Sequence, residues 1–295
     1  MNKKYSFIYI IIAATLWGIE GVLLLPHLYS LPVALVVFVQ TTILTVLLTP
    51  FFIKRFKHFK KLTKKDWLII SGLSFLGGVI GIIAITKSFF FVNYVNLSIV
   101  VLIQKLQPVF AILLAGIFLK EKLNSKFLLW SGLALFGAYI MTFGFSLPNM
   151  NTGGNLLFAS ALALIAAVSF ASTTVLTRTF LQKINPLDGT YLRFALSALF
   201  LGVIILLTGD YSSISQISTE NMKYFSIIVV TGGIGIFLYN LGLKSTKASI
   251  GTLCELAFPL TAILLEFFVR GNILSSVQWI GVVILFVSVG MITPK

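Results

Sequence analysis

Acidic residues, cysteine and histidine are scarce in this chain of 295 residues. It has 8 Asp and Glu against 22 Lys and Arg, only 10% of its residues are charged, and Cys254 is the single cysteine. A lone cysteine in an apolar run excludes a disulfide framework and a thiolate metal site within the chain. The two histidines, His27 and His58, are far apart in sequence, which leaves little material for a metal site or for His-based catalysis. We therefore expect no cofactor, no metal and no enzymatic activity.

Apolar residues are abundant instead. Hydrophobic residues make up 58% of the sequence, and the mean hydropathy is +1.03. Soluble domains carry about a quarter of charged residues, so this composition indicates an integral membrane protein. A hydrocarbon core about 30 Å thick needs about 20 apolar residues of helix. Runs of this kind are 5–25, 32–53, 67–91, 95–118, 126–145, 154–179, 187–208, 222–243, 248–269 and 275–293.

These runs are continuously apolar and lack the alternation that is typical of β-barrel strands. The sequence therefore predicts an all-α membrane protein with ten transmembrane helices. Positive charge is concentrated on one side of it: the linker 54–66 alone holds seven Lys or Arg, and on alternate crossings it shares its side with both termini. The positive-inside rule places that side in the cytoplasm and the protein in the cell membrane. We expect the linker to contact anionic lipid headgroups, and we expect no nucleic-acid partner.

Two segments 151 residues apart share the pattern S-I-x-x-L-x5-P-x2-A-I-L-L, one at 98–118 and the other at 249–269. The shared proline, with matches on both sides of it, favours a repeat over chance similarity between apolar helices. We interpret the chain as two five-helix repeats, 1–147 and 148–295. Because five is odd, the second repeat enters the membrane from the opposite side, which is the inverted-topology repeat of many secondary transporters.

An ordered set of segments resembles a known family. They are TLWGIEG at 15–21, KLQPVFAILLAGIFLKEKL at 105–123, WSGLALFGAYIM at 130–141, and their second-half counterparts at 238–267 and 279–290. In this order they resemble the EamA-domain branch of the drug/metabolite transporter superfamily. The resemblance implies alternating access around a central cavity and, commonly, export of amino acids or other small metabolites.

The chain departs from the family pattern at two places. The arginine that family members often carry in the second helix is Gln40 here, and Arg193 is the arginine at the equivalent site of the second repeat. The acidic residue after the fourth helix is Glu121, but its counterpart in the second repeat is Asn272. The two repeats are therefore not expected to have equal roles.

Ionisable residues inside the predicted spans are functional candidates, because a charge at mid-membrane depth costs about 3 kcal/mol or more without a partner or a wet cavity. They are Glu20, Lys87, Lys105, Arg193 and Glu255. Lys105 and Glu255 fall at similar depths in the two repeats. We expect them to form the anion-binding and cation-binding halves of a central substrate site; the alternative is that they neutralise one another as a buried pair.

Prolines follow both of these charges. Pro108 and Pro259 each remove a helix hydrogen bond and displace the carbonyl four residues earlier, which belongs to Gln104 and to Glu255 respectively. We expect the prolines to act as hinges, and Gln104 to contribute to substrate binding.

Further residues complete the expected cavity. Trp17, Tyr239 and Asn240 are candidates for its lining. Arg193 is a ligand for the substrate, a structural partner of Asp188, or a side chain that extends to the cytoplasmic interface. Burial favours the neutral form of a carboxyl group, so Glu255 first and Glu20 second are candidates for carrying a coupling proton.

These observations together favour a secondary transporter. We expect it to move a small metabolite, an amino acid or a related zwitterion or amine, by proton-coupled export, as a monomer or homodimer. The alternative is a passive channel or a membrane scaffold without transport activity.

The charge distribution makes a testable prediction about topology. In a Cys254→Ala background, single cysteines at Lys61 and Lys295 are expected to be shielded from a membrane-impermeant thiol reagent in intact cells. Cysteines at Asn151 and Ser213 are expected to label. If Lys61 and Ser213 label from the same side, the number of crossings or the inverted repeat is wrong.

Overall fold

The computed structural model describes residues 5–91, 98–147, 156–271 and 273–292, and within these ranges all regular structure is helical. The expectation of an all-α membrane protein is therefore confirmed. The helices of the first half are α1 (Ser6–Ile19), α2 (Val33–Phe52), α3 (Phe56–Phe59), α4 (Lys64–Phe75), α5 (Ile82–Phe91), α6 (Ser98–Gln104), α7 (Gln107–Phe118) and α8 (Ser125–Phe143). Those of the second half are α9 (Leu156–Leu181), α10 (Pro186–Thr208), α11 (Thr219–Leu243), α12 (Ala248–Cys254), α13 (Ala257–Arg270) and α14 (Ser276–Ile292).

The helices match the predicted spans closely. Among the described residues, nine helical segments are long and apolar enough to cross a membrane, and α14 is a further apolar helix of 17 residues. Two spans contain a stretch of π-helix: Glu20–Leu24 continues α1, and Leu76–Gly81 joins α4 to α5. Wide turns of this kind are frequent at functional sites.

Polar residues mark where several helices begin. Thr63 and Asp66 form a capping box at the start of α4, and Ser218 and Asn221 form one at the start of α11. These side chains satisfy backbone N–H groups that have no partner inside the helix. They fix the helix ends at the edges of the layer, where the chain leaves the apolar region.

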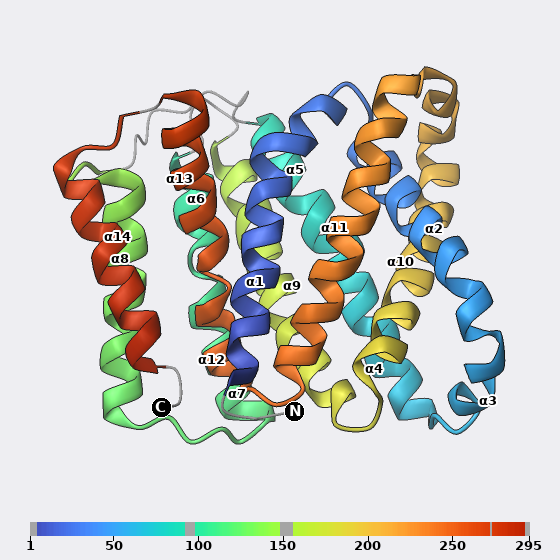
Figure 1. Cartoon of the computed structure of the whole chain (residues 1–295), viewed down its shortest axis with the longest axis horizontal. Coiled ribbons are helices and arrows are strands. Elements are labelled where there is room, and N and C mark those ends of the chain that lie inside the picture. Colours follow the sequence, from blue (N-terminus) through green and yellow to red (C-terminus); the bar gives the residue numbers. More distant parts are fainter. Residues whose placement is uncertain (1–4, 92–97, 148–155, 272, 293–295) are drawn as a thin grey trace.

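The helices stand roughly side by side at more than one depth, with α5 and α9 behind α1 and α11, and α1 begins and α14 ends at the same edge of the molecule (Figure 1). We call this edge the terminal edge. The helix α9 ends there too, so α9 runs opposite to α1 (Figure 1). The helices that pack together are α8 with α14, α2 with α10, α1 with α11, α5 with α9, α1 with α13, α7 with α9, and α7 with α12.

Glycines bring the helix backbones into close contact. A Cβ atom on Gly281 would lie 2.3 Å from the backbone nitrogen of Met141, and one on Gly137 would lie 2.7 Å from that of Leu285. Real Cβ atoms do not approach so closely, so α8 and α14 pack at a distance that only glycine allows. The glycines of the segment 76–81 pack in the same way, since a Cβ on Gly77 would lie 2.8 Å from the Thr173 side chain.

This packing predicts a large difference between two glycines of the α8–α14 pair. Gly281→Ala is expected to lower the unfolding free energy by about 1–3 kcal/mol, because backbone atoms must move apart to admit the methyl group. Gly132→Ala on α8 has no atom within 4 Å of the added Cβ, so it is expected to be neutral or slightly stabilising. Thermal melting of the purified variants in one detergent makes the comparison. Equal melting temperatures for the two variants would show that the helices are not in close contact.

Candidate functional site

Two helices are broken at matching positions of the two halves. The first break, at Lys105 and Leu106, separates α6 from α7, and the second, at Glu255 and Leu256, separates α12 from α13. Proline follows each break, as the sequence predicts. One detail differs: the Glu255 carbonyl is not left free, because it accepts a hydrogen bond of 2.9 Å from the Phe258 backbone N–H. The helix forms a tighter turn here, with a hydrogen bond between residues three apart instead of four. The Glu255 carbonyl thereby keeps a donor although Pro259 has no N–H.

The Glu255 carboxylate is the centre of a polar network inside the layer. Its Oε1 accepts from the Tyr239 hydroxyl at 2.8 Å and lies 3.3 Å from Thr174 Oγ1, and its Oε2 accepts from Gln107 Nε2 at 2.9 Å. These groups come from α11, α9 and α7. A carboxylate placed among apolar helices needs such donors, because the membrane provides none. The network therefore joins helices from both halves of the chain at the Glu255 carboxylate.

The network continues into the first helix break. Gln107 Oε1 accepts from Gln104 Nε2 at 3.1 Å, while Gln104 Oε1 is buried and has no hydrogen-bond partner among the described residues. Sequence reasoning identified Gln104 but missed Gln107. The available signal was its position, since Gln107 is a polar residue between the break and Pro108 in an otherwise apolar run.

Arg193 on α10 is the cation that faces this carboxylate. Its guanidinium lies within electrostatic range of Glu255 and Tyr239, yet it donates no hydrogen bond within the part of the chain that the structure describes. A guanidinium has five N–H donors in a fixed planar arrangement. Arg193 is half-buried, so these donors are held near the centre of the protein without a protein acceptor.

Asn240 and Trp17 flank the network. The Trp17 and Tyr239 rings pack with centroids 5.4 Å apart. Asn240 is buried and donates from Nδ2 to Thr190 Oγ1 at 2.9 Å, but its Oδ1 has no partner among the described residues. The site thus combines an aromatic pair with buried amide oxygens that lack donors. Of the residues predicted to line the site, the structure brings together Glu255, Gln104, Trp17, Tyr239 and Arg193, whereas Asn240, the neighbour of Tyr239 in sequence, is hydrogen-bonded to Thr190.

Lys105 has a different position from the one expected. It lies at the first break and is half-buried, and among the described residues it forms neither an ion pair nor a hydrogen bond with Glu255. The structure therefore shows no neutralising pair between the two. Arg193 is instead the cation within electrostatic range of the carboxylate. The arginine has the longer reach and comes from α10, which packs against α11 beside Tyr239.

A second carboxylate lies nearer the other edge. Glu20 is buried at the start of the π-helical stretch of α1, and it accepts a short hydrogen bond from the Thr231 hydroxyl. A Cβ on Gly232 would lie 2.8 Å from Gln40 Nε2 and 3.4 Å from Glu20 Oε1, so this glycine leaves room for both polar side chains. Lys87 is exposed and forms no ion pair with Glu20 within the described ranges.

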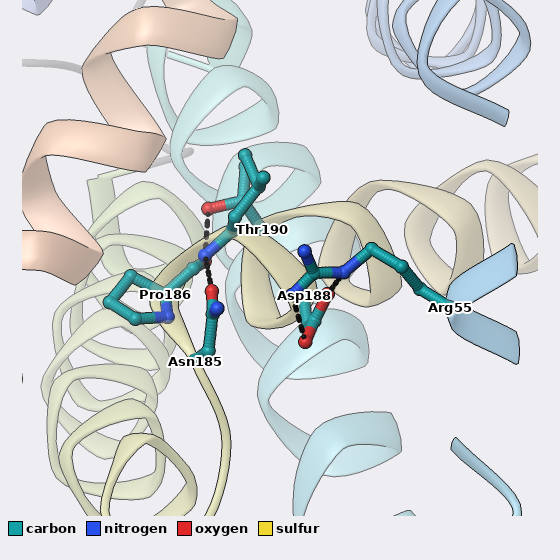
Figure 2. A network of polar contacts seen from close by, with 6 residues as sticks. Arg55, Asn185, Pro186, Asp188 and Thr190 are labelled. Atoms are coloured by element: carbon teal, nitrogen blue, oxygen red, sulfur yellow. Dashed lines mark hydrogen bonds and ion pairs between the residues drawn. The ribbon is translucent and has the colours of Figure 1, made fainter. Parts of the chain in front are cut away.

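Ion pairs between the halves gather at the terminal edge. The Arg55 guanidinium binds both oxygens of Asp188, at 2.6 and 2.8 Å, and Lys183 binds Asp66 at 2.6 Å. Figure 2 shows Arg55 reaching Asp188 in the first turn of α10, whose start is capped by Asn185. The partner of Asp188 is thus Arg55, and the predicted alternative of an Arg193 pair is wrong.

Glu121 adds a third link at this edge. Its carboxylate accepts from the backbone N–H groups of Ala248 and Ser249 and from the Ser249 hydroxyl. A first-half residue therefore caps α12, the short helix that ends at the second break. Asn272, its predicted counterpart, lies outside the described residues.

Comparison with known proteins agrees with this arrangement. The model of the EamA-like transporter family matches residues 4–143 and 157–293. The chain belongs to the EamA-like transporter family. The predicted resemblance is therefore confirmed, and as a family member the chain is a transporter and not an enzyme. In the ranges the structure describes, no group of three or more His, Cys, Asp or Glu is placed to hold a metal ion.

Individual members of the family are similar over most of their length. The riboflavin transporter ImpX of Fusobacterium nucleatum is 38% identical over 98% of this chain and 97% of its own. The uncharacterised transporter YyaM of Bacillus subtilis is 27% identical over 77% of this chain and 74% of its own. A protein crystal structure matches 99% of this chain and 97% of its own with a TM-score of 0.75 at 14% identity, which shows the same fold.

The network around Glu255 predicts that two Tyr→Phe substitutions lower the stability of the protein by different amounts. Tyr239→Phe removes a donor to a buried carboxylate and keeps the ring against Trp17, so the unfolding free energy is expected to fall by about 1.5–3 kcal/mol. Tyr139→Phe removes only an exposed bond to the Ser146 carbonyl, and its effect is expected to stay within about 0.5 kcal/mol. Denaturant or thermal unfolding in detergent measures both. A Tyr239→Phe variant as stable as Tyr139→Phe would show that the carboxylate does not depend on this hydroxyl.

Proposed function

We propose that this EamA-like transporter is a carrier for riboflavin or a closely related flavin, which it moves across the membrane by alternating access at the Glu255 network. The observation that carries the proposal is the 38% identity to a riboflavin transporter over 98% of the chain. Identity spread over both halves favours a shared cargo more than a match to one motif does.

The chemistry of the site supports a flavin. An isoalloxazine ring is planar and largely apolar, carries carbonyl and ring-nitrogen acceptors, and has one imide N–H donor. The Arg193 guanidinium has hydrogen-bond donors that find no acceptor among the described residues. The side-chain oxygens of Gln104 and Asn240 are acceptors that find no donor there. Buried polar groups without partners cost about 1–3 kcal/mol each, so a ligand that pairs with them gains affinity. Trp17 and Tyr239 supply aromatic surface for the ring.

An amino acid is less well accommodated. The expected cation-binding role requires Glu255 to accept from a substrate ammonium, but this carboxylate is already in contact with Tyr239, Thr174 and Gln107. A carboxylate has about four acceptor positions, so little capacity is left. The amino-acid prediction therefore gives way to a flavin, with Arg193 in place of Lys105 as the main donor.

We further propose ten spans in two inverted repeats, divided as predicted at residue 147. The packing pattern supports this, because several of the main helix pairs have counterparts when the halves are exchanged. In two of these pairs, α2 with α10 and α8 with α14, each helix packs against its own counterpart in the other half. Since α9 is the counterpart of α1, the contact of α1 with α11 corresponds to that of α9 with α5, and the contact of α1 with α13 corresponds to that of α9 with α7. The start of α1 and the end of α14 lie at one edge, which an even number of crossings requires (Figure 1).

The described conformation supports a carrier rather than a pore. The Arg55–Asp188 and Lys183–Asp66 pairs and the Glu121 cap close the terminal edge between the halves. Under the positive-inside rule this is the cytoplasmic edge. Opening it requires these contacts to separate, with Pro108 and Pro259 as hinges, and closing it again completes a transport cycle.

The flavin proposal predicts that Arg193→Gln weakens riboflavin binding about tenfold or more. A charge-assisted hydrogen bond contributes about 1.5–3 kcal/mol, and 1.4 kcal/mol corresponds to a factor of ten. The quenching of riboflavin fluorescence by the purified protein measures the dissociation constant. Lys87→Gln is the matched control, because it also removes an intramembrane cation but from an exposed position.

Three results bear on this proposal. Binding by the wild type and by Lys87→Gln with loss in Arg193→Gln supports it. No riboflavin binding by the wild type, together with a thermal shift on adding an amino acid or amine, overturns the flavin in favour of the earlier expectation. Counterflow in proteoliposomes separates carrier from channel, since only a carrier releases labelled riboflavin faster when unlabelled riboflavin is outside.

We propose proton coupling through Glu20 rather than Glu255. Thr231 is the one described donor to Glu20, whereas Glu255 has several donors and a nearby guanidinium. Glu20→Gln is expected to abolish riboflavin accumulation driven by a pH gradient and to retain counterflow. Glu220→Gln, at the exposed start of α11, is the control. Undiminished gradient-driven accumulation in both Glu20→Gln and Glu255→Gln would exclude these carboxyl groups as obligatory proton carriers.

A further inference from the structure

A basic recess lies at the terminal edge, away from the Glu255 network. Its volume is about 330 Å³, and it lies between the α7–α8 connection, α8, α12 and α14. Three lysines line it: Lys122 and Lys126 from the first half and Lys247 from the second. All three are exposed, and none forms an ion pair with a described residue. We call this the lysine recess.

Among the described residues, no acidic side chain lines the recess. Glu121 is the neighbour of Lys122, but its carboxylate is engaged by the backbone of Ala248 and Ser249 and by the Ser249 hydroxyl. Three unpaired ammonium groups around one hollow repel one another, and an anion between them relieves that repulsion. The recess therefore favours a ligand with at least one negative charge.

The remaining wall of the recess is apolar. It includes Phe127, Trp130, Ile250, Met291 and Ile292. On the same helices, next to the recess, the side chains of Leu128, Leu129 and Val287 are exposed. Because α8 and α14 lie at one end of the molecule (Figure 1), we expect exposed apolar side chains on them to meet the hydrocarbon of the membrane. The surface thus changes from cationic at the edge to apolar along the helices, with a tryptophan between.

We infer that the lysine recess is a binding site for an anionic phospholipid, whose phosphate lies among Lys122, Lys126 and Lys247 and whose acyl chains lie along α8 and α14. A soluble phosphate accounts for the lysines but not for the adjoining apolar surface. A zwitterionic phospholipid accounts for the apolar surface but brings its own cation to the lysines. A tryptophan at the level of the headgroups is typical of protein surfaces at the membrane interface.

The position gives the lipid a structural consequence. The lysines belong to both halves, and Ile250 lies on α12, the helix that leads into the break at Glu255. A headgroup in the recess therefore bridges the halves beside the Glu121 cap. The linker 54–66 is predicted to contact lipid from its positive charge alone, whereas the lysine recess adds an apolar surface to its charge. Substitutions of three lysines in each region therefore remove equal charge and can be compared.

Native mass spectrometry of the full-length protein in detergent tests the inference. The recess variant replaces Lys122, Lys126 and Lys247 by Gln. The control variant replaces Lys57, Lys60 and Lys61, three exposed lysines of the linker, whose attraction to lipid depends on the charge of a whole membrane surface and is expected to be lost in detergent. With added phosphatidylglycerol, the wild type and the control are expected to retain one lipid at least ten times more often than the recess variant. Phosphatidylcholine is expected to show no such difference. Equal retention of phosphatidylglycerol by the wild type and the recess variant overturns the site.

A second measurement distinguishes the lipid from free phosphate and does not depend on the stability of the triple variant. Phosphatidylglycerol brominated on its acyl chains is expected to quench part of the tryptophan fluorescence, and Trp130→Phe is expected to remove that part. Millimolar inorganic phosphate is expected to leave the quenching unchanged. Loss of quenching on adding phosphate shows a site for the free anion and overturns the lipid assignment, as does quenching that persists unaltered in Trp130→Phe.

Discussion

A carboxylate inside the bilayer must find its hydrogen-bond donors within the protein, because lipid provides none. Glu255 meets this requirement with Tyr239 from α11, Thr174 from α9 and Gln107 from α7. Three helices from both halves are therefore held around one group. The two helix breaks, the aromatic pair and the Arg193 guanidinium all lie around this network, which is why we propose it as the substrate site.

Close packing and edge contacts hold the frame in which the network sits. Glycines such as Gly137 and Gly281 let the α8 and α14 backbones touch, which fixes these helices as a rigid pair. The opposite behaviour is expected of the terminal edge, where Arg55–Asp188 and Lys183–Asp66 link the halves through partly exposed ion pairs. The cation of each pair is partly exposed, whereas the aspartate is buried, so separating a pair has to bring the aspartate into contact with water. One contact between the halves thus rests on close apolar packing and another on polar groups that water can replace.

The sequence predicted the helices well, because their apolar length and polar ends are local properties. It also placed the breaks correctly, since proline acts on its own helix. It did not predict which charged groups meet. Lys105 and Glu255 matched in depth, but depth does not determine the direction in which a side chain points. Asp188 finds Arg55, which is 133 residues away, and this pairing depends on how η4 (Ile53–Arg55) packs beside α10. Gln107 was missed because its importance comes from a partner in the other half.

The most direct test of the central claim is a structure of the protein with riboflavin bound, determined by cryo-electron microscopy in lipid nanodiscs. We predict density for the isoalloxazine ring between the two helix breaks, within hydrogen-bonding distance of Arg193 and in contact with the Trp17–Tyr239 pair. Density for the flavin away from the Glu255 network, with Arg193 still unpaired, would contradict the assignment of this network as the substrate site.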